Sequence, residues 1–291
     1  MTYTLWIILT GSLVGLTCGV TGSLLVLRKM SMIADAISHT VLLGIVGAFF
    51  VSQSLNGLPM LIGAGVVGIL TAFFVESLHS SGVQSDAAIG VVFTSLFALG
   101  VVLISFIGDQ VHLDTKHALM GEITFVPWNT LQINGVNYGP IAVWMLGIVL
   151  ILNLFLIWIF YKEIKISTFD PQYAKLIGVP VVFVHYLLMT MVSLSTVASF
   201  DSVGAILVVA MLIVPGATAY LLTDRFFPLL LLSGGIGILS ALIGYGFAAY
   251  WNVSVSGSMA SASGVLFLFA FLFSPKHGVI VRKIKNKQYA S

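Results

Sequence analysis

The sequence predicts an all-α membrane protein, a polytopic transmembrane helical bundle with about nine spans. Hydrophobic residues make up 59% of the 291 residues and charged residues only 8%, whereas soluble domains carry about 25% charged residues. The mean hydropathy is +1.11. Apolar runs of about 20 residues, the length that crosses a hydrocarbon core of about 30 Å, occupy most of the chain. We therefore expect residues 1–291 to form a single transmembrane domain.

Nine apolar runs are long enough to span a bilayer, although eight or ten crossings also fit the pattern. The first run has no basic residue before it, so we interpret it as a retained helix rather than a cleavable signal peptide. It contains the single cysteine, Cys18, which excludes an intrachain disulfide and a multi-thiolate metal site. The expected spans are residues 4–27, 30–51, 58–78, 86–107, 139–161, 180–199, 203–222, 226–250 and 257–273.

The basic residues predict the orientation of these spans. All of them except Lys116 follow the first, fifth, seventh or ninth span. Because loops rich in Lys and Arg stay on the cytoplasmic side, we expect the N-terminus outside and the C-terminus cytoplasmic. Residues 162–179 would then form a cytoplasmic loop, and residues 276–291 a basic cytoplasmic tail.

Glycine recurs every four residues in the first span, at Gly11, Gly15 and Gly19, with Gly22 close behind. Small residues at this spacing let two membrane helices approach closely. We interpret this stripe as a helix-packing seam.

The second span carries the strongest candidate site, in the stretch from Arg28 to Gly44. Asp35 and His39 are four residues apart and so lie on one face of a helix, with Ser38 beside them. An intramembrane carboxylate costs about 2.5–3.5 kcal/mol on insertion scales, which favours a functional role. Oxygen and imidazole donors suit Mn²⁺, Zn²⁺ or Fe²⁺ and do not suit Cu(I). The alternative is that Asp35 snorkels to the interface or pairs with Arg28.

Two ligands are too few to hold a metal tightly. Weak binding suits a transport path, where the ion must also leave, and a second copy of the chain could complete the site. The pair could therefore act as a gate or as a transient binding site.

The loop at residues 108–138 holds a second polar cluster. His112, Asp114, His117 and Glu122 could guide a cation or contact a delivery protein. We favour an interfacial hairpin with solvated charges and Trp128 among the lipid headgroups, and keep the four residues as a secondary candidate site.

The segment that follows the fifth span contains a short capped helix. Asp170 suits an N-cap, Pro171 the first helical position, Gly178 the C-terminal stop, and Pro180 prevents continuation. A helix of about two turns is not stable alone in water. It must lie against its own bundle or a partner.

No catalytic constellation accompanies these features. The sequence has no GxxxxGK[ST] phosphate loop, no HExxH helix and no GxSxG elbow. We expect a transport subunit rather than an enzyme, with no permanently bound cofactor and no nucleic-acid partner. We also expect His185 to be a hydrogen-bonded packing residue and Glu76 to stay solvated.

Several motifs together resemble the membrane permeases of metal-ion ABC importers. They are Arg28 and Met30 with Asp35, Ala36, Ser38 and His39, then FDPQYAKLIGVP from Phe169, SVGAILVVAMLIVPGATAYLL from Ser202, and SGVLFLFAFLFSPKHG from Ser263. HYLLM from His185 and the segment from Ser202 look closest to the manganese-type permeases of Gram-positive bacteria.

The resemblance implies a homodimeric permease in a bacterial cytoplasmic membrane, surrounded by lipid. Its partners would be two copies of a cytoplasmic ATPase and an extracellular metal-binding lipoprotein. Asp35 and His39 would line the path of manganese, or alternatively zinc or iron(II). The coupling helix that docks on the ATPase would include Phe169, Asp170, Pro171, Ala174, Lys175 and Gly178.

Two transporter alternatives stay open. A permease for chelated metal or cobalamin is the nearest, although its large cargo would not need ligand side chains. A gradient-driven carrier would need coupling-ion sites and usually an internal repeat, which we do not detect. A non-transporting scaffold would explain the glycine packing but not the intramembrane Asp35 and His39.

Overall fold

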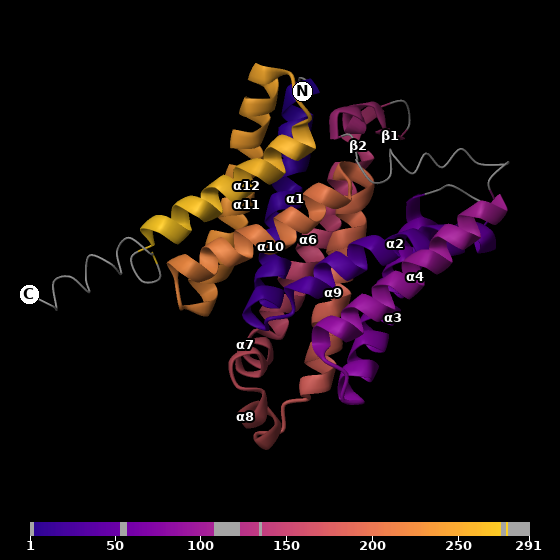
Figure 1. Ribbon diagram of the computed structural model, residues 1–291. Helices are drawn as coiled ribbons and strands as arrows, with labels where there is room; N and C mark the ends of the chain where they lie inside the picture. The colour runs from indigo at the N-terminus through magenta and orange to yellow at the C-terminus, as the bar shows by residue number, and fades with distance from the viewer. Residues whose placement is uncertain (1–2, 53–56, 108–122, 134–135, 275–277, 279–291) are drawn as a thin grey trace, which may run out of the picture.

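A bundle of long helices forms most of the computed structural model, which describes residues 3–52, 57–107, 123–133, 136–274 and 278 (Figure 1). Nine helices in these ranges are long and apolar enough to cross a membrane. This confirms the expected architecture and number of spans. They are α1 (Tyr3–Leu27), α2 (Ser31–Ser52), α3 (Gly57–Ser80), α4 (Ser85–Ile107), α6 (Ile141–Ile159), α9 (Val181–Val203), α10 (Ala205–Leu222), α11 (Phe226–Trp251) and α12 (Val255–Phe273).

Helix α1 is the central helix of the bundle. It packs against α10 and α11 along most of its length, and against α6 and α9 on another side. Buried polar side chains accompany the second contact: Cys18 Sγ lies 3.3 Å from Ser199 Oγ of α9. Nearby, Asn153 Nδ2 of α6 donates to Ser195 Oγ of α9 over 2.7 Å.

The glycine stripe of α1 is the packing seam that the sequence predicts. Gly15 lies against the backbone of Gly237 in α11, and Gly22 lies against the backbone of Leu212 in α10. A methyl group at either glycine would overlap main-chain atoms, which cannot move aside as a flexible side chain can. The Ser233 hydroxyl of α11 also donates to the carbonyl of Gly19.

Helices α2, α3 and α4 lie side by side at one flank of α1 and α10 (Figure 1). Gly44 of α2 packs against the backbone of Gly63 and Ala64 in α3. Thr71 Oγ1 of α3 donates to Thr40 Oγ1 of α2 over 2.9 Å, and both hydroxyls are buried. These contacts hold one face of α2 and leave another face of the helix half-exposed.

A tight turn joins α1 to α2. The amide of Met30 donates to the carbonyl of Leu25, and that of Lys29 to the carbonyl of Val26. This is a Schellman motif, in which the residue after the helix takes the left-handed conformation that glycine favours. Here Lys29 holds that position, with φ of 60°.

Two short helices project from the end of the bundle at which α1 joins α2, α7 (Tyr161–Phe169) and α8 (Pro171–Leu176). Helix α8 begins and ends as predicted: Asp170 Oδ1 accepts from the Tyr173 amide over 2.9 Å, and Pro171 is the first helical residue. Gly178 stops it with φ of 84°. Helix α7 was not predicted; the fifth span, expected over 139–161, ends instead at Ile159 and the chain turns at Phe160 into α7.

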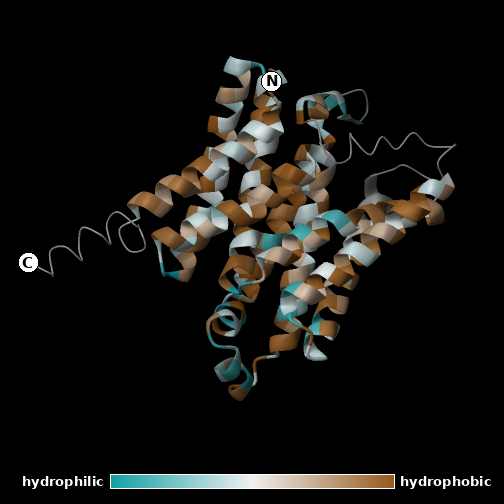
Figure 2. Cartoon of the chain, viewed as in Figure 1, coloured by the Kyte–Doolittle hydropathy of each residue, from teal (hydrophilic) through white to brown (hydrophobic). Residues whose placement is uncertain are grey.

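The opposite end carries a small non-helical element. A 3₁₀ helix, η1 (Ile123–Trp128), precedes an antiparallel hairpin of β1 (Thr130–Ile133) and β2 (Val136–Pro140). The Trp128 side chain is 72% exposed and contacts Phe125. Figure 2 shows the apolar residues along the long helices and many hydrophilic residues at the α7–α8 end.

Candidate functional site

Asp35 and His39 lie together on the half-exposed face of α2. His39 Nε2 is 3.5 Å from Asp35 Oδ1, and the two side chains are 30% and 41% exposed, respectively. Two ligands bonded to one metal at about 2.1 Å in tetrahedral geometry lie about 3.4 Å apart. The observed separation is therefore compatible with one ion shared by both side chains.

Two rings of α4 support the imidazole. The ring centroids of Phe93 and Phe97 lie 5.2 Å and 5.9 Å from that of His39. These two phenylalanines are four residues apart and so share a face of α4. Sequence reasoning missed them, because nothing in the local pattern says which face of α4 meets α2.

Ser38 does not belong to this site. Its side chain is buried, and its hydroxyl donates to the Ala34 carbonyl one turn earlier over 2.9 Å. Its neighbour in the sequence, His39, points to the half-exposed face instead. Of the three polar residues in this stretch, the structure brings together only the carboxylate and the imidazole.

The described part of one chain does not assemble a complete ligand set. Among the described residues, no group of three or more His, Cys, Asp or Glu side chains is placed to hold a metal. The secondary candidates His112, Asp114, His117 and Glu122 lie outside the described residues. The donor set that the structure describes is therefore one carboxylate and one imidazole per chain.

Arg28 does not pair with Asp35, which was one of the two alternative roles for that carboxylate. Its side chain reaches the end of α7, where Nη2 donates to Ser167 Oγ over 2.7 Å and Nε to Thr168 Oγ1 over 3.2 Å. Burial lowers the pKa of the Arg28 guanidinium to about 10. The side chain thus remains a cation at neutral pH and links the α1–α2 turn to α7.

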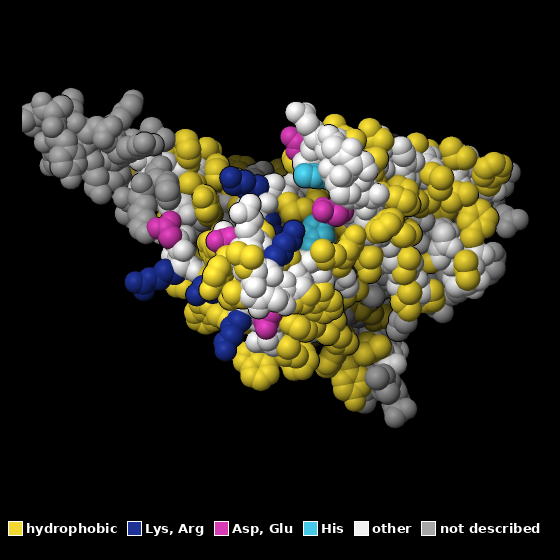
Figure 3. All heavy atoms as spheres, turned by 90° about the horizontal axis from the view of Figure 1, so that it is seen from below, with side chains coloured by type: hydrophobic (Ala, Val, Ile, Leu, Met, Phe, Trp, Pro, Cys, Tyr) yellow, Lys and Arg dark blue, Asp and Glu magenta, His cyan; other side chains and the backbone are white. Residues whose placement is uncertain are grey.

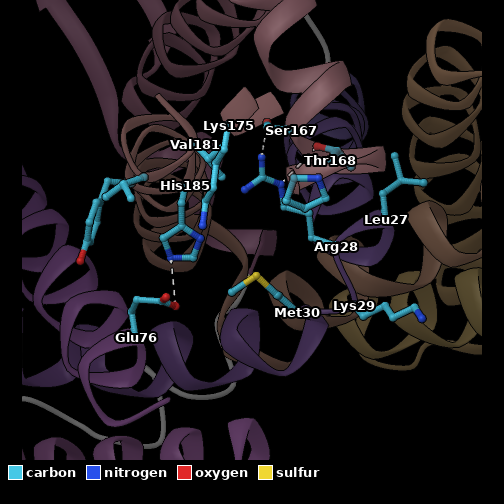
Figure 4. A pocket seen from close by; sticks show the side chains of 13 residues that line it. Leu27, Arg28, Lys29, Met30, Glu76, Ser167, Thr168, Lys175, Val181 and His185 are labelled. Carbon is cyan, nitrogen blue, oxygen red and sulfur yellow. Dashed lines mark hydrogen bonds and ion pairs between the residues drawn. The ribbon is translucent and has the colours of Figure 1, made fainter. Parts of the chain in front are cut away.

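A cleft of about 540 Å³ opens beside this link (Figure 4). It lies between the α1–α2 turn, α3, the end of α7, α8 and the start of α9. Its charged lining residues are Arg28, Lys29, Glu76 and Lys175, together with His185. The sequence did not predict this cleft, since its walls come from segments far apart in the chain.

His185 and Glu76 form a pair within the cleft. His185 Nε2 lies 3.8 Å from Glu76 Oε2, and the His185 side chain is only 13% exposed. The imidazole also packs edge-on against Tyr186. His185 is packed as expected, but its 3.8 Å separation from Glu76 is an ion-pair distance and not the expected hydrogen bond. Glu76, which was expected to stay solvated, lies beside this imidazole.

The residues expected to couple the chain to an ATPase lie together at the tip of the α7–α8 end. Among them, Ala174 is buried and Phe169 is 55% exposed. Their neighbours Tyr173 and Leu176, which were not among the expected residues, are 53% and 85% exposed. Isolated short helices of this kind require a supporting surface. The exposed apolar side chains give α8 a face that its own bundle does not cover.

Comparison with known proteins shows what kind of membrane protein this architecture represents. The family model described as ABC 3 transport family matches residues 1–274. The chain belongs to this family. It is therefore a membrane permease subunit of an ABC transporter, a multi-pass protein of the bacterial cell membrane, and not an enzyme.

Individual relatives match the permease over nearly its whole length. It is 63% identical to the manganese transport system membrane protein MntD of Bacillus subtilis, covering 98% of this chain and 97% of that protein. It is 41% identical to the zinc transport system membrane protein TroD of Treponema pallidum, covering 96% and 76%. The solved structure of PsaBC from Streptococcus pneumoniae in complex with Fab matches with a TM-score of 0.81 and 34% identity, covering 99% of this chain and 96% of that one.

Proposed function

We propose that this permease imports a divalent transition-metal ion, with manganese favoured over zinc or iron(II). The observation that carries the proposal is the Asp35–His39 pair, two metal-binding side chains 3.5 Å apart and still accessible on a membrane-spanning helix. An ion pair placed in a membrane only for stability is expected to be shielded from lipid by its own bundle. The names of MntD and TroD, which refer to manganese and zinc transport, support this cargo class.

A second copy of the chain would complete the site. If the half-exposed faces of two α2 helices meet across a two-fold axis, two carboxylates and two imidazoles converge. Four donors of this kind suit Mn²⁺, Fe²⁺ or Zn²⁺. A site shared between two copies can be opened by a small change in their relative position, which allows release of the ion.

The orientation that we propose for the permease in the membrane rests on the distribution of its basic residues. The described basic residues are Arg28, Lys29, Lys162, Lys165, Lys175 and Arg225, in the α1–α2 turn, α7, α8 and the α10–α11 turn. Figure 3 shows Lys and Arg side chains gathered on the face that carries α7 and α8. We assign this face to the cytoplasm, which places the N-terminus outside and the C-terminus inside.

On this assignment α8 is the coupling helix. The exposed side chains of Phe169, Tyr173 and Leu176 would dock on a cytoplasmic ATPase, one for each copy of the permease. The opposite, extracellular face would receive the ion from a metal-binding lipoprotein. The permease itself would supply the path, and the ATPase the energy.

Metal uptake by a strain that lacks this chain tests the proposal. Accumulation of Mn²⁺, Zn²⁺ and Fe²⁺ would be measured before and after the wild-type gene is restored. We expect restoration to recover Mn²⁺ uptake most strongly. Recovery of only a chelated metal or cobalamin would contradict the free-ion cargo.

The site is tested by Asp35→Asn and His39→Ala in the same strain. Asp35→Asn replaces the anionic carboxylate with a neutral amide, which is a weaker ligand, and His39→Ala removes the imidazole. Both should therefore reduce uptake to background while the complex still assembles with its ATPase. Asp86→Asn is the matched control, since Asp86 is an exposed carboxylate in the first turn of α4 and not part of the pair. Normal uptake by either site variant would refute the assignment of that residue.

Dependence on ATP separates an importer from a gradient-driven carrier. The permease reconstituted with its ATPase should accumulate Mn²⁺ in vesicles only when ATP is present on the ATPase side. Uptake that follows an imposed ion gradient without ATP would favour the carrier.

A further inference from the structure

The cleft between the α1–α2 turn, α3, α7, α8 and α9 has an excess of positive charge among its lining residues. Arg28, Lys29 and Lys175 line it together with one carboxylate, Glu76. That carboxylate faces His185 at 3.8 Å on the α3 side of the cleft. The described lining residues therefore do not neutralise the three cations.

Arg28 is the most buried of these cations, since Lys29 and Lys175 are exposed. It is half-buried, and its two hydrogen bonds go to the neutral hydroxyls of Ser167 and Thr168. No described carboxylate forms an ion pair with it. A guanidinium has five N–H donors, so the two hydroxyl contacts leave most of its donors available, and a desolvated cation gains from an anionic partner.

Lys175 approaches the same space from α8. Figure 4 shows the Lys175 and Arg28 side chains entering the cleft from different elements, whereas Lys29 turns away from them. The Thr168 hydroxyl accepts a hydrogen bond from Arg28 and keeps its own proton to donate. A fork of guanidinium donors, an ammonium and a hydroxyl thus surround one part of the cleft.

An ATPase docked on α8 is not expected to fill the cleft, because the two lie on different sides of the helix. Pro171 and Lys175, one turn apart, line the cleft, while Leu176 and Tyr173 are exposed on the other side of the helix. The proposed apolar docking face therefore points away from the cleft. A small ligand can occupy the cleft while α8 engages a protein partner.

We propose that the cleft binds a phosphate group through Arg28, Lys175 and Thr168. Planar guanidinium donors match phosphate oxygens in pairs, lysine serves as a point charge for the same group, and charge-assisted hydrogen bonds are about twice as strong as neutral ones. The phosphate belongs either to an anionic phospholipid headgroup or to a soluble phosphate compound. In both cases the phosphate bridges Arg28 of the α1–α2 turn and Lys175 of α8, beside the link that Arg28 makes to α7.

Binding to the full-length permease in detergent, depleted of lipid, tests this site at constant ionic strength. One arm titrates inorganic phosphate, and the other titrates phosphatidylglycerol in mixed micelles, with zwitterionic phosphatidylcholine for comparison. The melting temperature reports binding, because a ligand specific for the folded state stabilises it. We expect a saturable rise with at least one anionic probe and none with phosphatidylcholine.

Arg28→Gln and Lys175→Gln should each weaken that binding about tenfold, since one charge-assisted hydrogen bond contributes enough for such a change in affinity. Lys165→Gln is the matched control: it removes the same charge from an exposed position on α7 outside the cleft, and should leave the affinity unchanged. A saturable response to phosphatidylglycerol alone assigns a lipid headgroup, and a response to inorganic phosphate assigns a soluble source.

The proposal is overturned if neither anionic probe gives a saturable response. It is equally overturned if Lys165→Gln weakens binding as much as Lys175→Gln, because bulk charge would then account for the effect. Should Arg28→Gln fail to fold, the comparison of Lys175→Gln with Lys165→Gln still decides, since both lysines are exposed.

Discussion

Helices α1 and α2 follow one another in the chain and have almost equal hydropathy, 1.7 and 1.8, yet they differ in their surroundings. Within an apolar 18-residue stretch of each helix, 72% of the residues are buried in α1, against 50% in α2. Helix α1 meets its neighbours through glycines and main-chain contacts, whereas α2 presents Asp35 and His39 on a half-exposed face. Hydropathy therefore identifies a span, but the distribution of small and ionisable residues distinguishes a structural helix from a candidate transport helix.

The strongest test of this contrast places the same methyl group in each helix. Gly22→Ala in α1 would push a Cβ into the backbone of Leu212, whereas Gly47→Ala in α2 meets no atom within 4 Å. Overpacking of this kind costs about 1–3 kcal/mol, so the first variant should lose most of its folded protein. Size-exclusion chromatography of fluorescently tagged permease measures the amount of folded protein. Equal profiles for the two variants would contradict the difference in packing between α1 and α2.

A smaller effect is expected from the rings that support the candidate site. Phe93→Ala removes the nearer ring beside His39, so the imidazole loses orientation while both donors remain. Changes to residues that orient a metal ligand typically cost 10–100-fold in affinity or activity. We expect metal uptake to fall about tenfold, mainly through a raised KM, with assembly unchanged.

Phe74→Ala on α3 is the control for that experiment, because Phe74 is 43% exposed and its ring contacts Phe73. Uptake should be normal in this variant. If Phe93→Ala lowered Vmax and protein level together, the ring would be a packing residue and not a positioning residue.

Much of the fold could be predicted from the sequence because its signals are local. A run of apolar residues identifies a span wherever it packs, and the Asp170, Pro171 and Gly178 pattern places α8 by its caps alone. Helix α7 was missed, because its sequence is too polar for a span and no capping side chain marks its start.

In the candidate site, too, contacts within one helix could be predicted from the sequence and contacts between distant segments could not. Asp35 and His39 are four residues apart, so helical geometry alone brings them together. The link from Arg28 to Ser167 joins residues 139 positions apart, and depends on how α1 and α7 pack. Phe93 and Glu76 were missed for the same reason, since hydropathy does not determine which helices become neighbours.

Loss of the N-cap of α8 should have a smaller effect than loss of the Phe93 ring. Asp170→Ala removes the acceptor of the Tyr173 amide, which costs about 1 kcal/mol of helix stability. Helix α8, like the open face of α2, has little support from its own bundle, so its association with the ATPase should weaken several-fold. Co-purification of the two subunits measures this.

Asp170→Ser provides the matched control for α8. Serine is also a good N-cap, so this variant should retain most of the association although it lacks the carboxylate. A loss equal to that of Asp170→Ala would show that the charge of Asp170, rather than the cap, holds the partner.

The smallest effect is expected at the turn between α1 and α2. Lys29 has φ of 60°, where an L-residue with a side chain is strained and glycine is not. Lys29→Gly relieves that strain but gives the unfolded chain more freedom, so the net gain should be below about 1 kcal/mol. Lys29→Ala removes the same ammonium group and keeps the strain, and should therefore give no gain. A melting temperature about 1–2 °C higher for the glycine variant alone would show that the turn joining α1 to α2 is held against its backbone preference by the packing on either side.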